Sequence, residues 1–198
     1  MAENDNYSGM VDGINGLIDR QIFSNEKIYS IELEKVFTRS WLLVGHETQI
    51  PSNGDFITSR MGAESVILCR DSNGKIHVFL NTCTHRGMKV CLYDEGNTAT
   101  FTCPFHAWSF ATDGKLVGVP HEKELYSKSL NKEKWSLIEV SQMFNYKGSI
   151  WATWDKSAPN FIEYLGGAKA HLDFALDSLD GSEGGTEVFG GVHKWISP

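Results

Sequence analysis

Residues 83–87 read Cys-Thr-His-Arg-Gly, and residues 103–108 read Cys-Pro-Phe-His-Ala-Trp. Each stretch carries one cysteine and one histidine at close spacing, Cys83 with His85 and Cys103 with His106. Seventeen residues, numbers 86–102, separate His85 from Cys103. Thiolates and imidazoles are strong metal ligands, and one zinc ion accepts two of each in a tetrahedron. The four side chains therefore predict a metal centre, but their composition alone does not identify the metal.

The spacing of the four ligands helps to distinguish two kinds of centre. A Cys-x-His pair is tighter than the usual ligand pairs of zinc fingers. Each pair also follows a predicted strand and enters a loop containing Gly87 or Pro104, as two loops that hold one inorganic core would require. Two cysteines with two histidines are also the ligand set of a Rieske [2Fe–2S] centre. The sequence favours this cluster, and a zinc-stabilised interaction module stays as an alternative.

Short runs rich in β-branched and aromatic residues surround the ligands and predict strands. These runs lie at residues 41–44, 55–59, 65–69, 76–80, 98–102, 116–119, 136–140 and 149–154. Turn residues that tolerate positive φ separate several of the runs. They lie at residues 73–74, 95–97, 113–114 and 147–148. The pattern predicts a mainly β fold, with both ligand pairs in loops between strands.

Both ends of the chain differ from this β pattern. Apolar residues at helix-like spacing predict helices in the first forty residues, and they are Ile14, Leu17, Ile18, Ile28, Ile31, Leu33 and Phe37. Residues 161–179 also read as helical, with an interruption at Gly166 and Gly167, and the apolar run 187–196 resembles a strand without a partner. We expect a helical segment at 1–40, a β domain at 41–157 and the start of another domain at 158–198.

Composition and charge limit the kinds of partner. The chain has 198 residues and a formal net charge of −7, which argues against binding nucleic acid or anionic membranes through overall charge. No apolar run approaches the roughly 20 residues that cross a bilayer, and residues 1–6 lack the regions of a signal peptide. We therefore expect a cytoplasmic protein with no nucleic-acid or membrane partner. In that reducing setting, Cys69 and Cys91 are expected to be buried, inert thiols.

The ligand pairs and their spacing resemble the Rieske motif of aromatic ring-hydroxylating dioxygenase α subunits. Further residues extend the resemblance over nearly the whole chain, and they lie at 41–45, 81, 85–88, 106–108, 116–120 and 123–126. The resemblance implies a Rieske-type antiparallel β-sandwich with a two-loop subdomain for the cluster and helices at either end. It also implies that Cys83 and Cys103 bind the buried iron of the cluster, while His85 and His106 bind the outer iron.

The same resemblance implies partners and a reaction. Electrons would pass from NADH through a reductase and a ferredoxin, and a mononuclear Fe(II) would use them in the cis-dihydroxylation of an aromatic hydrocarbon. Enzymes of the family are typically trimers of α subunits, often with β subunits added. Arg86, Lys89 and Lys115 lie in or near the cluster loops and are candidates to meet an acidic ferredoxin.

The sequence lacks the mononuclear iron site of that family, an Asp-x-x-His-x-x-x-x-His run. The histidines outside the cluster motif do not have this separation, and they are His46, His77, His121, His171 and His193. We therefore assign no catalytic residue and expect a fragment that relays electrons, with the second iron and the aromatic substrate bound beyond residue 198. A stand-alone Rieske ferredoxin is the other alternative, although such carriers are usually shorter and lack the flanking segments.

Four residues near the ligands bear on the redox potential. Rieske proteins of respiratory complexes have Ser and Tyr hydroxyl groups that donate to the cluster, where this sequence has Trp108 and Phe110. Met88 and Phe105 stand where those proteins have a disulfide. Fewer donors stabilise the added electron less, so we expect a midpoint near the low end of the Rieske range of about −150 to +300 mV.

Overall fold

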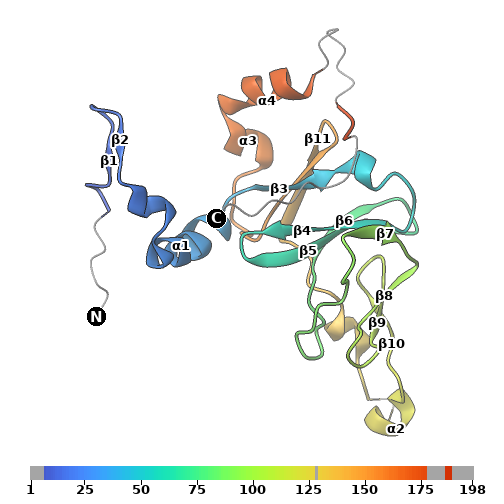
Figure 1. The fold of residues 1–198 in the computed structure, drawn as a ribbon. Coiled ribbons are helices and arrows are strands. Elements are labelled where there is room, and N and C mark those ends of the chain that lie inside the picture. The colour runs from blue at the N-terminus through green and yellow to red at the C-terminus, as the bar shows by residue number, and fades with distance from the viewer. Residues whose placement is uncertain (1–6, 128, 178–185, 189–198) are drawn as a thin grey trace.

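The computed structural model describes residues 7–127, 129–177 and 186–188, and Figure 1 shows their arrangement. The described chain is mainly β, its strand ladders are antiparallel, and short helices lie towards both ends. Residues 178–179 of the predicted helix and 189–196 of the predicted last strand lie outside the described residues. Within the described ranges, no helix is long and apolar enough to cross a membrane.

The largest sheet has the strand order β6-β5-β4-β7. Its strands are β4 (Asp55–Met61), β5 (Glu64–Arg70), β6 (Ile76–Leu80) and β7 (Glu95–Asn97). Successive side chains of a strand point to opposite faces, so the four fully buried residues 66–69 of β5 serve two cores. Val66 and Leu68 belong to one hydrophobic cluster, and Ile67 and Cys69 belong to another. This central strand therefore supports the sandwich on one face and the metal loops on the other.

A second sheet covers the Val66 face and has the strand order β11-β12-β3. Its strands are β3 (Leu42–His46), β11 (Gln142–Tyr146) and β12 (Ser149–Thr153). The hairpin between β11 and β12 turns through Lys147 at φ 50° and Gly148 at φ 87°, the positive values that a tight two-residue turn requires. Ile150 of this sheet is fully buried against the first sheet, which confirms the predicted antiparallel β-sandwich.

A third, smaller sheet carries one of the metal loops and has the order β10-β9-β8. Its strands are β8 (Thr100–Thr102), β9 (Ser109–Ala111) and β10 (Leu116–Gly118). Figure 1 shows it projecting from the larger sheets, with the short helix α2 (Glu122–Tyr126) at its far end. Phe101, Phe110 and Leu116 attach it to the core that contains Ile67 and Cys69. This sheet forms part of the predicted two-loop subdomain.

Helices flank the β region, as predicted. The N-terminal part contains a 3-10 turn (Arg20–Phe23), α1 (Glu26–Glu32) and a π-helical turn (Leu33–Phe37). The C-terminal part contains α3 (Phe161–Leu165) and α4 (Ala168–Leu176), and the chain breaks between them at Gly166, which has φ 49°. Phe161 is fully buried and packs edge-on against Trp41, with ring centroids 5.4 Å apart, so α3 is anchored beside the second sheet.

The predicted helix through Ile14, Leu17 and Ile18 is wrong. Strands β1 (Val11–Asp12) and β2 (Leu17–Ile18) pair as a small hairpin there. The Asp12 carboxylate accepts hydrogen bonds from the backbone N–H groups of Ile14 and Asn15, at 3.0 and 3.1 Å. An aspartate that satisfies the following backbone groups favours a turn over a helix, and this local chemistry outweighs the apolar spacing.

Several boundaries within the β region also differ from expectation. Residues 95–97, predicted to be a turn, form β7 and pair with β4. Residues 136–140 were expected to be a strand, but they make a single bridge, Phe79 to Glu139, and two backbone hydrogen bonds to β6. The sequence did not predict β9, β11 or α2, and the remaining short 3-10 turns lie at Glu47–Gln49 and Lys132–Trp135.

Candidate metal centre

The two ligand-bearing loops have the same backbone structure. In loop 1 (residues 83–88), the N–H of Cys83 donates to the carbonyl of Met88 at 2.7 Å, and Gly87 N–H donates to the Cys83 carbonyl at 2.8 Å. In loop 2 (residues 103–108), Cys103 donates to the carbonyl of Trp108 at 2.8 Å, and Ala107 donates to the Cys103 carbonyl at 2.9 Å. The chain thus builds one type of turn twice, and each turn begins with a cysteine.

The matching position of each loop has a left-handed backbone. Gly87 has φ 74° and Ala107 has φ 55°. Glycine adopts this conformation at little cost, whereas a residue with a Cβ is strained by roughly 1–2 kcal/mol. Loop 2 therefore keeps the turn geometry in spite of a less suitable residue.

The two predicted sulfur ligands lie side by side in the interior. Cys83 and Cys103 are each 2% exposed, and their thiols are close enough to interact. Burial raises the pKa of Cys83, and the neighbouring Cys103 thiol raises it further, while the backbone N–H groups of His85 and Arg86 act in the opposite direction. Two thiolates this close in a dry site need a cation to balance them. The pair thus has the chemistry of a metal-binding site.

The two predicted nitrogen ligands also lie together, nearer the surface. The rings of His85 and His106 have centroids 4.8 Å apart, and both residues are partly exposed. Burial lowers the pKa of His85, and the neighbouring His106 and Arg86 lower it further. The neutral imidazole, which is the form that binds a metal, is therefore favoured at this position.

The four predicted ligands form two pairs that differ in burial, two buried thiols and two partly exposed imidazoles. A tetrahedral zinc site needs all four donor atoms around one centre. A Rieske cluster instead has two cysteines on one iron and two histidines on the other. An inner thiol pair with an outer imidazole pair therefore fits the dinuclear cluster.

Aromatic rings cover the imidazole pair. The buried Trp108 lies parallel to the ring of His85, with centroids 4.7 Å apart and an interplanar angle of 10°. Trp135 packs edge-on against Trp108, and its carbonyl accepts a 2.7 Å hydrogen bond from the Thr84 hydroxyl. Trp135 thus fastens loop 1 to the 3-10 turn at Lys132–Trp135. Sequence reasoning missed this residue, because nothing in its surroundings signals a contact 51 positions away.

The other two cysteines are buried, as expected. Cys69 is fully buried, and burial raises the pKa of its thiol to about 12. Burial also raises the pKa of Cys91. Each thiol donates to a backbone carbonyl, Cys69 to Thr112 at 3.4 Å and Cys91 to Tyr93 at 3.6 Å, which supports an inert role for both.

The candidate basic residues near the loops differ in their surroundings. Arg86 and Lys89 are exposed in and just after loop 1. Lys115 forms an ion pair with Asp113, at 2.7 Å between Nζ and Oδ2, which neutralises part of its charge. The positive surface of the metal loops therefore belongs to loop 1.

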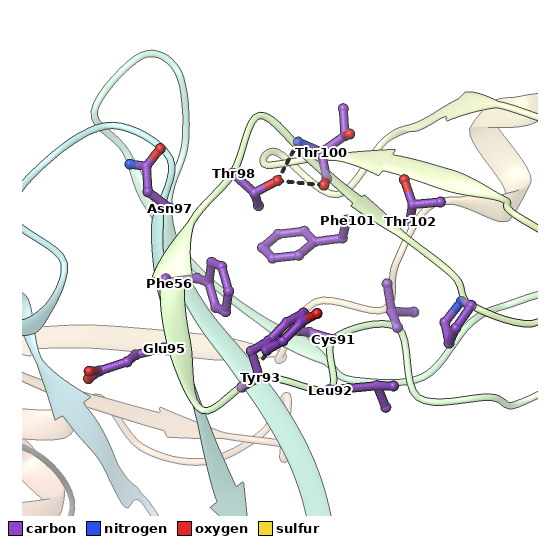
Figure 2. A pocket seen from close by; sticks show the side chains of 13 residues that line it. Phe56, Cys91, Leu92, Tyr93, Glu95, Asn97, Thr98, Thr100, Phe101 and Thr102 are labelled. Carbon is purple, nitrogen blue, oxygen red and sulfur yellow. Dashed lines mark hydrogen bonds between the residues drawn. The ribbon is translucent and has the colours of Figure 1, made fainter.

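A groove of about 510 Å³ runs beside loop 2. Figure 2 shows Phe56, Phe101 and Tyr93 turned towards its interior. The segment of residues 90–93, which returns from loop 1, forms one wall, and Pro104 of loop 2 also lines it. On its groove side, the returning segment is therefore not packed against another strand.

Comparison with known proteins agrees with this geometry. The Rieske [2Fe–2S] domain family matches residues 40–134. Over 189 residues, the chain is 47% identical to the biphenyl 2,3-dioxygenase α subunit of Rhodococcus jostii (strain RHA1), covering 96% of the chain and 40% of that relative. Over 183 residues, it is 48% identical to a benzene 1,2-dioxygenase α subunit of Pseudomonas putida, covering 92% of the chain and 40% of the relative.

A solved structure extends the agreement to the fold. The crystal structure of naphthalene 1,2-dioxygenase from Rhodococcus sp. matches with a TM-score of 0.81 and 37% identity, over 87% of this chain and 39% of that one. The chain therefore carries a Rieske [2Fe–2S] domain. More narrowly, it is similar over nearly its whole length to α subunits of aromatic dioxygenases, and it spans about 40% of the length of those relatives. The matches do not favour a stand-alone ferredoxin or a zinc module.

Proposed function

We propose that the chain binds one Rieske [2Fe–2S] cluster, with Cys83 and Cys103 on the inner iron and His85 and His106 on the outer iron. The observation that carries this proposal is that the same two loops bring two buried thiols together and two partly exposed imidazoles together. When bound, the cluster takes up and releases one electron at a time. The protein would serve as the electron relay of a ring-hydroxylating dioxygenase.

The residues of the chain would give the site three properties. Burial of Cys83 and Cys103 excludes water from the sulfur side. Neutral His85 and His106 leave the oxidised core with a formal charge near zero, so an added electron meets less repulsion than in a four-thiolate site. Trp108 shields one face of His85, while the partly exposed edge of the imidazole pair provides the short route for an electron to a partner.

The wider enzyme system is part of the same proposal. Its relatives are α subunits named as biphenyl and benzene dioxygenases, which supports an aromatic hydrocarbon as the substrate. Electrons would arrive from an NADH-dependent reductase and a ferredoxin and would leave for a mononuclear Fe(II), held in a part of the α subunit outside this chain. Other α subunits in a trimer, together with β subunits, would complete the assembly.

Two expectations from the sequence also belong to this proposal. We keep the division into residues 1–40, 41–157 and 158–198, since the sandwich and both metal loops lie within the middle part. We also keep a cytoplasmic location, which agrees with the four described cysteines being free thiols.

Metal analysis of the 198-residue chain, purified without oxygen, tests the proposal. We expect about two irons and two acid-labile sulfides per chain, and an electron spin resonance signal that appears on reduction. One zinc per chain without labile sulfide would contradict the cluster and support the zinc module. Reduction by a ferredoxin with NADH and a reductase then tests the relay itself.

A further inference from the structure

The two metal loops are supported in different ways. Loop 2 closes a hairpin, because Thr102 of β8 pairs with Ser109 of β9 directly outside Cys103 and Trp108. The side chains of the same two residues also meet, with 3.0 Å between the Thr102 and Ser109 hydroxyl oxygens. A backbone ladder therefore fixes both ends of loop 2.

Loop 1 has no such ladder. Strand β6 ends at Leu80, before the loop, and the described chain forms no strand after it until β7 begins at Glu95. The returning segment lies against the groove of Figure 2, where Cys91, Leu92 and Tyr93 line one wall. Outside the Cys83–Met88 backbone bond, something other than strand pairing must therefore hold together the chain on either side of loop 1.

The side chain of Asn81 occupies the place of the missing strand partner. Its Oδ1 accepts hydrogen bonds from the backbone N–H groups of Val90, at 3.1 Å, and Cys91, at 2.8 Å. Its Nδ2 donates to the Cys91 carbonyl at 2.8 Å and to the Ser65 hydroxyl at 3.3 Å. The amide thus bonds both the N–H and the carbonyl of Cys91, as a facing residue does in an antiparallel pair.

Asn81 is well suited to this role because it is fixed and fully used. It is 1% exposed, and its own N–H donates to the Ser65 carbonyl of β5 at 2.9 Å. A side-chain amide offers two donor hydrogens and an acceptor oxygen with two lone pairs, and all four bonds are made here. Asn81 therefore joins loop 1 to the central strand, in addition to the Thr84–Trp135 bond and the bonds of Thr58 to residues 93 and 94.

We propose that Asn81 is a positioning residue for the metal centre: its amide replaces a strand in closing loop 1 and so sets where Cys83 and His85 stand relative to loop 2. The inference rests on the proposed function for its link to the cluster. Its structural part, the joining of residues 81 and 90–91 by the Asn81 amide outside the Cys83–Met88 backbone bond, stands on the hydrogen bonds alone.

Three variants separate the contributions. Asn81→Asp keeps the shape and the accepting oxygen but loses both donated bonds, and it places an oxygen against the Cys91 carbonyl. Ser65→Ala removes only the outermost of the four bonds. Thr102→Val is the matched control in loop 2, because it removes the hydroxyl contact and leaves the backbone ladder in place.

Hydrogen exchange of the 198-residue chain as purified, read by mass spectrometry, is the test. In N81D we expect the backbone amide hydrogens of residues 82–93 to exchange roughly tenfold faster than in the wild type, while those of residues 102–109 exchange at the wild-type rate. We expect T102V to leave both segments unchanged. On reduction, the spin resonance spectrum of the cluster should differ from wild type in N81D and match it in T102V, which a merely stabilising role would not predict.

Equal exchange of residues 82–93 in N81D and wild type would overturn the inference. If N81D also loses protection in the central strand, residues 64–70, then S65A decides. We expect S65A to raise the exchange rate about two- to threefold, and only in residues 82–93. An unchanged exchange rate in S65A would count against the inference. A wild-type chain without iron and sulfide would contradict the proposed function, but the exchange comparison would still be decided by its own result.

Discussion

Around its ligands, loop 1 is polar and basic, with Thr84, Arg86 and Lys89, whereas loop 2 presents the apolar side chains of Pro104 and Phe105. The backbone hydrogen bonds of the two loops are nevertheless the same, so the placement of the cysteines does not depend on these side chains. The comparison teaches that the backbone fixes the shape within each loop, while the exposed surface of each loop is free to differ.

If the loops contribute equal halves of the centre, removing one sulfur from either should have the same, and the largest, effect. Cys83→Ser and Cys103→Ser should each abolish the cluster almost completely, because a buried hydroxyl is a poor replacement for a thiolate on iron. Iron and sulfide analysis measures the loss. Cys91→Ala is the control and should keep the cluster, and full retention in either serine variant would disprove the ligand assignment.

Strand β6, which precedes loop 1, contacts the small sheet that carries loop 2 at Gly114, in the turn between β9 and β10. Gly114 has φ 82°, and a Cβ there would lie 2.6 Å from the ring of Phe79 on β6. Gly114→Ala should therefore lower the free energy of unfolding by about 2–4 kcal/mol, from left-handed strain and overpacking together. Denaturant unfolding tests this value, and a loss below about 1 kcal/mol would show that the contact between Gly114 and Phe79 is loosely packed.

The site was more predictable than the strand boundaries. The four predicted ligands stand out in the sequence because ligand type and spacing are local features. The structure brings together the two thiols, Cys83 and Cys103, and the two imidazoles, His85 and His106. The equal backbones of the loops could not be predicted, since Gly87 and Ala107 give different signals for the same left-handed turn. Asn81 was visible only as part of a family resemblance, and its four side-chain hydrogen bonds became known from the fold.

Two errors in the predicted fold have a common physical cause. Apolar content predicts a strand at residues 136–140, but the chain there packs beside β6 with few ladder bonds. Turn-forming residues predict a turn at residues 95–97, which instead form β7. In both places tertiary contacts decide, because hydrogen-bond partners come from segments that are distant in the sequence. The helix predicted at residues 11–18 is wrong for the opposite reason, because a local turn at Asp12 outweighs the helical spacing of the apolar residues.

Trp108 of loop 2 stacks on His85 of loop 1, so the redox potential should report on this contact between the two loops. We expect the wild-type midpoint near the low end of the Rieske range, and a value above about +100 mV would contradict that prediction. Trp108→Leu should raise the midpoint on the order of tens of mV, because water admitted beside the imidazoles stabilises the more negative reduced cluster. Redox titration measures both, and an unchanged midpoint would assign Trp108 to packing alone.

The basic surface of loop 1 should act on the rate of electron delivery. Reversing Arg86 and Lys89 to Glu should slow reduction by an acidic ferredoxin by up to about tenfold at low salt, and the difference should shrink as salt rises. Phe105→Ala in loop 2 is the matched control, since its effect should not depend on ionic strength. Stopped-flow reduction against salt concentration tests this pair, and a flat profile for the wild type would exclude steering by loop 1.

Exchanging the left-handed residues of the two loops tests their equivalence most finely. Gly87→Ala meets no atom within 4 Å, so its cost is the strain of a left-handed residue, reduced by the lower entropy of the unfolded chain, for a net loss of about 1 kcal/mol. Ala107→Gly should change stability by a similar or smaller amount in the opposite direction, because the same two contributions reverse. The double exchange should then lie within about 0.5 kcal/mol of the wild type in denaturant unfolding, since the sites are distinct turns. A large loss in both single variants would mean that the loops share hydrogen bonds but not the same tolerance at this position, and that the side chains around loop 2 require the methyl group of Ala107.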